Sequence, residues 1–272
     1  MIGFGRDDIK ICPQKKGATT PPQHERTQPM TTTKKRARWP FILLATSGLI
    51  GVLFMGGMYV KNVMMTRHTF WEWQIRQYER RERRKFPPKG GILFIGSSSI
   101  RYWKTLKRDM KPLPVINRGF GGSHIRHILH YDERIVFPYK PKIVVIYSGE
   151  NDLSAGVSVE KVVTHLELVI TKIRQRLPGT RFFYISIKPS LLRYRRWPLF
   201  KVANASIKSW IATQKDVEYI DVSKAMHTSS GRLRRDIFVW DRLHMNRKGY
   251  KLWTPIVRTR VMKTWQQLNS KK

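Results

Sequence analysis

The stretch ILFIGSSSI, residues 92–100, decides the fold of this chain. Four consecutive apolar residues predict a short strand, and the glycine and serines that follow predict a sharp turn into a helix. Similar short apolar runs occur at 115–116, 143–147, 182–187 and 219–222. They alternate with longer helical patterns near 158–176, 196–213 and 247–267. This alternation predicts an α/β fold built on a parallel sheet.

The composition is that of a strongly basic globular protein. Among 272 residues there are 53 Lys and Arg against 18 Asp and Glu, which gives a formal charge of +35 at pH 7, and 41% of residues are hydrophobic. Such a chain can bury a core, and its charge favours anionic neighbours such as lipid headgroups, envelope polyanions or nucleic acid. Cys12 is the single cysteine, so we expect no internal disulfide. Neither a CxxC pair nor a Cys/His cluster predicts a metal site, and no cofactor is expected.

The first 88 residues indicate a tail, a membrane anchor and a connector. Residues 1–40 are basic and lack apolar periodicity, which predicts a disordered cytoplasmic tail, with Met30 as an alternative start. Residues 41–60, FILLATSGLIGVLFMGGMYV, are uncharged and as a helix would reach roughly 30 Å, enough to span a bilayer. A cleaved signal peptide is the alternative, but its apolar region is about 7 to 15 residues long. Residues 61–88 are predicted to be a juxtamembrane stalk and linker, and residues 89–272 the globular domain.

Lys and Arg are more frequent just before the apolar run than just after it. The positive-inside rule therefore predicts an N-terminus in the cytoplasm. The globular domain would then lie on the far side of the inner membrane, in a bacterial periplasm.

Four polar motifs lie beyond the carboxyl ends of predicted strands, which is where parallel sheets usually carry their functional residues. Taken singly, such serine runs and glycine turns commonly cap helices or close loops. Together they offer a hydroxyl nucleophile, a base with an orienting acid, and donors for an oxyanion, which is what acyl transfer needs. The motifs are GSSS at 96–99, NRGFGGS at 117–123, SGEND at 148–152 and DRLHMN at 241–246.

In order and spacing, ILFIGSSSI, NRGFGGSHI, YSGENDL and DRLHMN resemble the four sequence blocks of the SGNH hydrolase superfamily, the GDSL esterases and lipases. The resemblance runs from about residue 91 to residue 268, and the GFGGS stretch is similar to the platelet-activating-factor acetylhydrolase subgroup. It implies a three-layer α/β/α sandwich around a flavodoxin-like parallel sheet of about five strands. The pattern departs at Ser97, where the usual aspartate is absent, and at Ser99, where leucine is common.

Residue by residue, the resemblance implies that Ser98 is the nucleophile, His244 the base and Asp241 the acid that orients it. The oxyanion hole would consist of the backbone N–H groups of Ser98 and Gly122 and the side-chain amide of Asn151. A histidine that accepts the serine proton while a carboxylate fixes its tautomer is a common arrangement on unrelated folds. No metal is required for this chemistry.

The sequence therefore predicts a membrane-anchored serine esterase that hydrolyses a carboxylic ester of a lipid or envelope glycan through an acyl-serine intermediate. One alternative is an acyltransferase that uses the same triad. Another is a polyanion-binding envelope protein whose esterase activity is vestigial. Nucleic acid is the least favoured partner, because no zinc-finger, RNP-like or helix-turn-helix pattern is present. The acyl group, the alcohol and the oligomeric state are not readable from these motifs.

Overall fold

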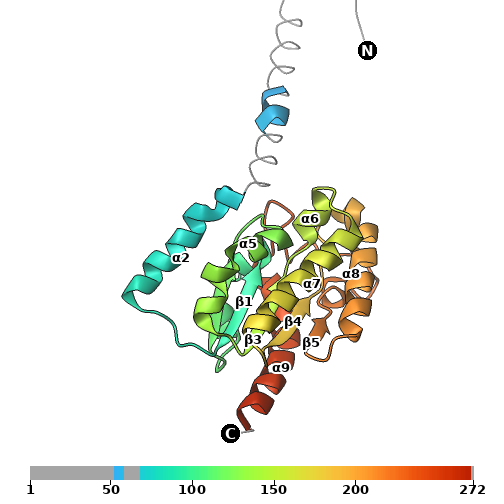
Figure 1. Cartoon of the computed structure of the whole chain (residues 1–272). Helices are drawn as coiled ribbons and strands as arrows, with labels where there is room; N and C mark the ends of the chain where they lie inside the picture. Colours follow the sequence, from blue (N-terminus) through green and yellow to red (C-terminus); the bar gives the residue numbers. More distant parts are fainter. Residues whose placement is uncertain (1–51, 58–67, 271–272) are drawn as a thin grey trace, which may run out of the picture. The chain divides into compact units, whose positions relative to one another are not determined.

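The computed structural model describes residues 52–57 and 68–270, and in these residues five parallel strands form one sheet in the order β2-β1-β3-β4-β5 (Figure 1). Strand β1, which lies between β2 and β3, pairs with both in the same register, so that Ile92 lies beside both Val115 and Ile143. The predicted α/β fold with a parallel sheet is confirmed. The strands are β1 (Ile92–Gly96), β2 (Val115–Gly119), β3 (Ile143–Tyr147), β4 (Arg181–Ile185) and β5 (Val217–Ile220).

Helices connect the strands and cover both faces of the sheet. The principal ones are α2 (Glu72–Arg84), α3 (Ser98–Arg101), α4 (Leu106–Asp109), α5 (Ile125–Ile135), α6 (Glu150–Ser154), α7 (Val159–Arg176), α8 (Trp197–Ala212) and α9 (Arg247–Ser270). Short 3-10 helices are η1 (His68–Trp71), η2 (Phe137–Tyr139), η3 (Tyr194–Arg196) and η4 (Lys224–Met226). The three long helices expected from the sequence are α7, α8 and α9.

Two apolar cores flank the sheet, because successive side chains of a strand point to opposite faces. On β1, Leu93 and Ile95 pack into the core shared with α5, α7 and α8, whereas Ile92 and Phe94 pack into the core shared with α9. All four side chains are fully buried. The fold is therefore the expected three-layer α/β/α sandwich.

The connector expected at 61–88 contributes a helix to the domain. Trp71, at the end of η1, is 2% exposed, and Ile75 of α2 is fully buried in the same core as Leu93. Arg134 of α5 forms ion pairs with Glu72 and Glu79 of α2. Residues 68–84 thus belong to the folded unit.

The predicted anchor, 41–60, lies outside the described residues except for 52–57, which are helical. Their apolar side chains Val52, Leu53, Phe54 and Met55 are exposed. Within the described part of the chain, every helix is too short or too polar to cross a membrane. The tail predicted at 1–40 also falls outside that part.

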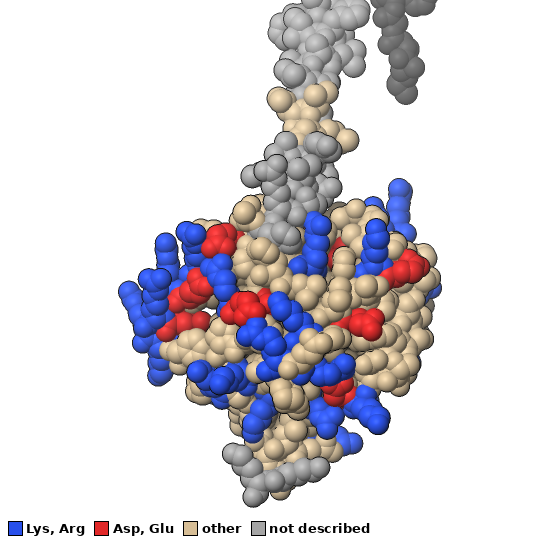
Figure 2. All heavy atoms as spheres, in the orientation of Figure 1, with Lys and Arg blue, Asp and Glu red and all other residues tan. Residues whose placement is uncertain are grey.

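Positive charge is prominent on the surface of the domain. In the face drawn in Figure 2, Lys and Arg side chains outnumber the acidic ones and gather at the left edge and across the lower middle, while much of the right side is formed by other residues. Several of the acidic residues are engaged in ion pairs, for example Asp216 with Arg174 and Asp109 with Arg247.

Candidate active site

The turn that carries the predicted nucleophile, Ser98, follows β1 and depends on Gly96. Its φ is +131°, and a Cβ at this position would come within 1.9 Å of the carbonyl oxygen of Tyr147, so only glycine fits. Ser98 begins helix α3, and of the three consecutive serines it alone is partly accessible, since Ser97 and Ser99 are 2% and 3% exposed. The turn therefore presents the hydroxyl of Ser98 to the carboxyl edge of the sheet.

The loop after β2 passes next to this serine. A Cβ added to Gly121 would lie 3.8 Å from Cβ of Ser98, which locates the loop beside the nucleophile turn. Gly122 has φ of +78°, a left-handed conformation that favours glycine. Asn151 of α6 donates from Nδ2 to the carbonyl oxygen of Ser123 at 3.1 Å. Ser98, Gly122 and Asn151 are thus brought to the ends of three adjacent strands, β1, β2 and β3.

Asp241 and His244 form a tight turn before α9. His244 Nδ1 lies 2.5 Å from Asp241 Oδ2, and Asp241 Oδ1 accepts the backbone N–H groups of Leu243 and His244, each at 2.9 Å. Burial acts to raise the pKa of Asp241, but the hydrogen bonds from His244 and Leu243 bring it below its ordinary value. The carboxylate is therefore ionised and holds Nδ1, which leaves Nε2 of His244 available to the substrate side.

An aromatic contact joins His244 to the end of helix α3, which begins at Ser98. The ring of Tyr102 packs edge-on against the ring of His244 with centroids 4.8 Å apart, and the backbone N–H of Tyr102 donates to the carbonyl oxygen of Ser98 at 2.8 Å. Among the described residues no hydrogen bond joins Ser98 directly to His244. Catalytic hydrogen bonds are often loose without substrate and tighten when it binds.

Arg242 lies between Asp241 and Leu243 in a left-handed conformation, with φ of +60°. Such a conformation costs a non-glycine residue of order 1 to 3 kcal/mol and is maintained by its surroundings. Here the backbone N–H of Arg242 donates to Val239, and its carbonyl oxygen accepts the N–H of Leu192. These two bonds hold the turn in the conformation that pairs Asp241 with His244.

The sequence did not single out three charged residues that contact the site. Lys188 follows β4, Arg193 lies five residues further, and Glu150 directly precedes Asn151. Arg193 Nη1 lies 3.1 Å from Glu150 Oε1, and Lys188 Nζ lies 3.4 Å from Glu150 Oε2. Lys188 could have been found by examining the end of β4 as well as the ends of the first three strands.

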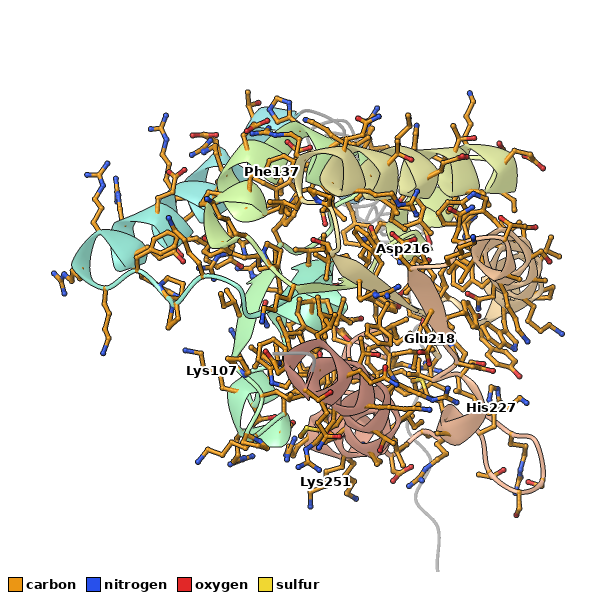
Figure 3. The ribbon with its side chains drawn as sticks, turned by 60° about the horizontal axis from the view of Figure 1, so that its bottom comes forward. Lys107, Phe137, Asp216, Glu218, His227 and Lys251 are labelled. Atoms are coloured by element: carbon orange, nitrogen blue, oxygen red, sulfur yellow. The ribbon has the colours of Figure 1, made fainter. Side chains whose placement is uncertain are left out.

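Two cavities lie on different parts of the domain. One, of about 1050 Å³, adjoins the catalytic turn, since Arg242 and Tyr194 line it together with His227. The other, of about 900 Å³, adjoins the amino end of β2 and is lined by Val115 and Lys107. Lys107 and His227 are labelled well apart in Figure 3. The first cavity is a groove beside the turn of Asp241 and His244, and Ser98 and His244 are not among the residues that line it.

No group of His, Cys, Asp and Glu side chains within residues 52–57 and 68–270 could hold a metal ion. The chemistry that this arrangement can perform is nucleophilic attack by a serine, with proton transfer through an imidazole and stabilisation of an oxyanion by neutral N–H donors.

Comparison with known proteins gives a family match and a set of similar folds. The model of the GDSL-like lipase/acylhydrolase family matches residues 96–252. A protein from Streptococcus pneumonia with the provisional description of a platelet activating factor is 19% identical, with a TM-score of 0.64, over 75% of this chain and 97% of that chain. No curated protein matches this chain.

Two further solved structures resemble the domain. A GDSL-like lipase from Bacteroides thetaiotaomicron is 16% identical, with a TM-score of 0.60, over 70% of this chain and 98% of that chain. A variant of an acetyl xylan esterase from Geobacillus stearothermophilus is 16% identical, with a TM-score of 0.51, over 63% of this chain and 94% of that chain. At these identities the structures indicate a shared fold.

Proposed function

Because the chain belongs to the GDSL-like lipase/acylhydrolase family and is a carboxylic ester hydrolase, we propose that Ser98, His244 and Asp241 carry out the hydrolysis at a membrane surface. The proposal rests on the positions of Ser98, the Gly121–Gly122 loop and the His244–Asp241 pair relative to one another. The partly accessible hydroxyl of Ser98 lies beside the Gly121–Gly122 loop, and Tyr102 connects its helix to the His244–Asp241 pair.

In the first half-reaction, Ser98 Oγ attacks the ester carbonyl carbon while Nε2 of His244 takes the hydroxyl proton. The carbonyl oxygen becomes an oxyanion, which the N–H groups of Ser98 and Gly122 and the amide of Asn151 stabilise. The bond to the alcohol then breaks, and His244 returns the proton to the leaving oxygen. Water attacks the acyl-serine in the same way, which releases the acid and restores Ser98.

The substrate that we propose is an acyl or acetyl ester of a lipid or an envelope glycan. The 20-residue apolar run at 41–60 supports a membrane location, with the N-terminus in the cytoplasm and the catalytic domain in the periplasm. The groove beside the catalytic turn is lined by Leu191 and Tyr194 as well as by several arginines. Such a groove suits an apolar chain or sugar attached to an anionic group.

The test of the nucleophile is a fluorophosphonate label on the full chain in detergent, followed by mass spectrometry of the peptide that contains residues 97–99. We expect the adduct on Ser98 and loss of p-nitrophenyl ester hydrolysis in Ser98→Ala, whereas Ser97→Ala keeps most of the activity. An adduct on Ser97, with Ser98→Ala fully active, would overturn the assignment. An acyl-chain-length series in the same assay identifies the acyl group.

The acyltransferase alternative is tested by adding an acceptor alcohol to the same assay. Faster release of p-nitrophenol with formation of the new ester would identify transfer. Tight binding to an anionic polymer without turnover would instead support the polyanion-binding alternative, which the charge of +35 favours.

A further inference from the structure

The segment after β4, residues 188–193, contacts the turn that carries the base. Nζ of Lys188 donates to the carbonyl oxygen of Leu243 at 2.9 Å, and the backbone N–H of Leu192 donates to the carbonyl oxygen of Arg242 at 3.0 Å. Both acceptors lie between Asp241 and His244 in the sequence. This segment, which we call the bridge segment, therefore holds the turn in place from one side.

The bridge segment also reaches the oxyanion side of the site. Arg193 Nη1 donates to Oδ1 of Asn151 at 3.0 Å. An amide whose oxygen is held by a cation must turn its NH₂ group in the opposite direction. Accordingly, Nδ2 of Asn151 faces the loop that contains Gly122 and donates to Ser123 there. Arg193 thus determines which end of the Asn151 amide is available to an oxyanion.

Glu150 connects Lys188, which contacts Leu243, to Arg193, which contacts Asn151. It is 4% exposed, and its Oε2 accepts the hydroxyl of Tyr147 at 2.7 Å besides lying near Lys188, which is 1% exposed. Burial alone would raise the pKa of Glu150, but Lys188 and Arg193 together bring it below its ordinary value. Burial lowers the pKa of Lys188, and the charge of Glu150 opposes that change. When Glu150, Lys188 and Arg193 are all ionised, they carry a net charge of one positive unit next to the oxygen of the Asn151 amide.

We propose that Glu150, Lys188 and Arg193 are positioning residues. They keep the Asn151 amide and the turn that carries Asp241 and His244 in fixed positions relative to each other. Arg193 orients the Asn151 amide, Lys188 holds the Leu243 carbonyl, and Glu150 fixes both cations. The inference rests on the proposed function. Because an oxyanion develops only in the transition state, loss of this positioning lowers kcat and leaves KM nearly unchanged.

The first experiment measures kcat and KM of the full chain in detergent for a p-nitrophenyl ester. Loss of one oxyanion donor typically costs about 100- to 1,000-fold, so Arg193→Gln, which only releases a donor, should lower kcat by about 10- to 100-fold. Arg195→Gln is the matched control. It removes the same charge two residues away, from an exposed side chain with no described hydrogen bond or ion pair, and should behave like the wild type.

A double-mutant cycle tests whether Arg193 acts through Asn151. In an Asn151→Ala background, Arg193→Gln should cause no further loss of kcat, because its partner is already gone. Losses that multiply would mean that Arg193 acts by a route other than the Asn151 amide, which would overturn its proposed role in orienting that amide. Arg193→Lys, which retains the charge and a donor nitrogen, should recover part of the activity.

Lys188 needs a paired change, because removing it alone leaves the charge of Glu150 buried. The double variant Lys188→Met with Glu150→Gln removes both charges, and thermal unfolding reports whether it folds. A folded double variant with native kcat would refute the role of these two residues. Reduced kcat at an unchanged KM is the expected result.

These outcomes separate the inference from the function on which it rests. Absence of ester hydrolysis in the wild type would refute the proposed function. The side-chain amide resonances of Asn151, assigned from their loss in Asn151→Ala, report its orientation without turnover, and Arg193→Gln should shift them whereas Arg195→Gln should not. An active wild type whose Arg193→Gln variant matches Arg195→Gln in kcat and in these resonances would refute the positioning role alone.

Discussion

At the scale of single residues, Asp241 has both a structural and a chemical task. Its Oδ1 accepts two backbone N–H groups and thereby closes the turn, while its Oδ2 holds the ring of His244. An amide in its place can still accept at one oxygen and so maintain the turn, but its NH₂ group would face Nδ1 of the ring. The structural and chemical contributions of Asp241 are therefore separable by mutation.

We predict that His244→Ala removes nearly all turnover and that Asp241→Asn keeps the fold but lowers kcat by at least about 100-fold, or roughly 2.7 kcal/mol of barrier. In serine proteases, replacing the triad aspartate by asparagine favours the wrong tautomer of the histidine. The double variant should be little worse than His244→Ala, because residues that act as a unit are not additive. Near-native kcat in Asp241→Asn would mean that another group orients the base.

Asp152 is a buried carboxyl beside the site, and its ionisation affects stability. Its Oδ1 accepts the backbone N–H of Ile125 at the start of α5, while within the described chain its Oδ2 has no hydrogen-bond partner. Burial raises the pKa of Asp152 to about 7, an effect that the Ile125 N–H partly opposes. The folded state therefore binds the proton more tightly than the unfolded state does. The resulting stability is complete below about pH 4 and is lost as the pH rises through 7.

We predict that Asp152→Asn abolishes the loss of stability as the pH rises through 7, because the amide stays neutral and can still accept the Ile125 N–H. Relative to the wild type, the variant should gain about 2 to 4 kcal/mol of unfolding free energy between pH 5 and pH 8. Denaturant unfolding at several pH values measures it. Asp236→Asn is the control, since the ion pair with Arg234 lowers the pKa of Asp236 and its carboxyl does not titrate in this range. Parallel pH profiles for Asp152→Asn and the wild type would contradict the prediction.

At the scale of elements, η1 and α2 support the loop that carries Gly122. The indole N–H of Trp71 donates to the carbonyl oxygen of Gly121 at 2.8 Å, and the side chains of Gln74 and Tyr78 both donate to the carbonyl oxygen of Gly119. A glycine-rich loop has many conformations in the unfolded chain, so donors on a packed helix are needed to select one. Helix α2 therefore belongs to the structural support of the active site.

We predict that Trp71→Phe leaves the Gly121 carbonyl unsatisfied and lowers the unfolding free energy by about 1 to 3 kcal/mol. It should also lower kcat, because the loop that carries Gly122, whose N–H we propose as an oxyanion donor, is no longer held. Trp73→Phe is the matched control, since Trp73 is 63% exposed, and its effect should stay within about 0.5 kcal/mol. Thermal unfolding and ester hydrolysis of both variants check the prediction, which fails if the two behave alike.

At the scale of the whole molecule, two forces could attach the protein to a membrane. One is the apolar run at 41–60, and the other is the attraction of a chain with a formal charge of +35 to anionic lipids. They differ in their response to salt, because polybasic contacts are screened whereas burial of an apolar span is effectively irreversible. The two attachments can therefore be distinguished by a simple wash.

We predict that the full chain stays in the membrane fraction after a wash in 1 M salt and that a reporter active only outside the cytoplasm works when fused after Lys272. Deletion of residues 41–60 provides the control, and any residual membrane binding of that variant should be removed by salt. Release of the full chain by salt, or activity only from a cytoplasmic reporter, would contradict the predicted topology.

Local sequence was sufficient for the fold and for the family of this protein. Short apolar runs that alternate with amphipathic helices have few other arrangements, because a parallel sheet must be covered on both faces. The resemblance of the four motifs to a known family predicted the catalytic residues, and the carboxyl ends of parallel strands meet at one edge of the sheet. Ser98, Gly122 and Asn151 follow adjacent strands there, and Asp241 and His244 are close enough in sequence to pair within one turn.

Only the tertiary structure revealed what holds these groups in position. Arg193 and Asn151 are 42 residues apart in the chain, and Trp71 and Gly121 are 50 apart. The position of Lys188 after β4 makes it a candidate site residue, but nothing local shows that it contacts Leu243. Trp71, in a basic connector, carries no local pattern that distinguishes it from a surface residue. Their roles arise from burial and hydrogen bonding between distant segments, which depend on how the layers pack and not on the periodicity of any one segment.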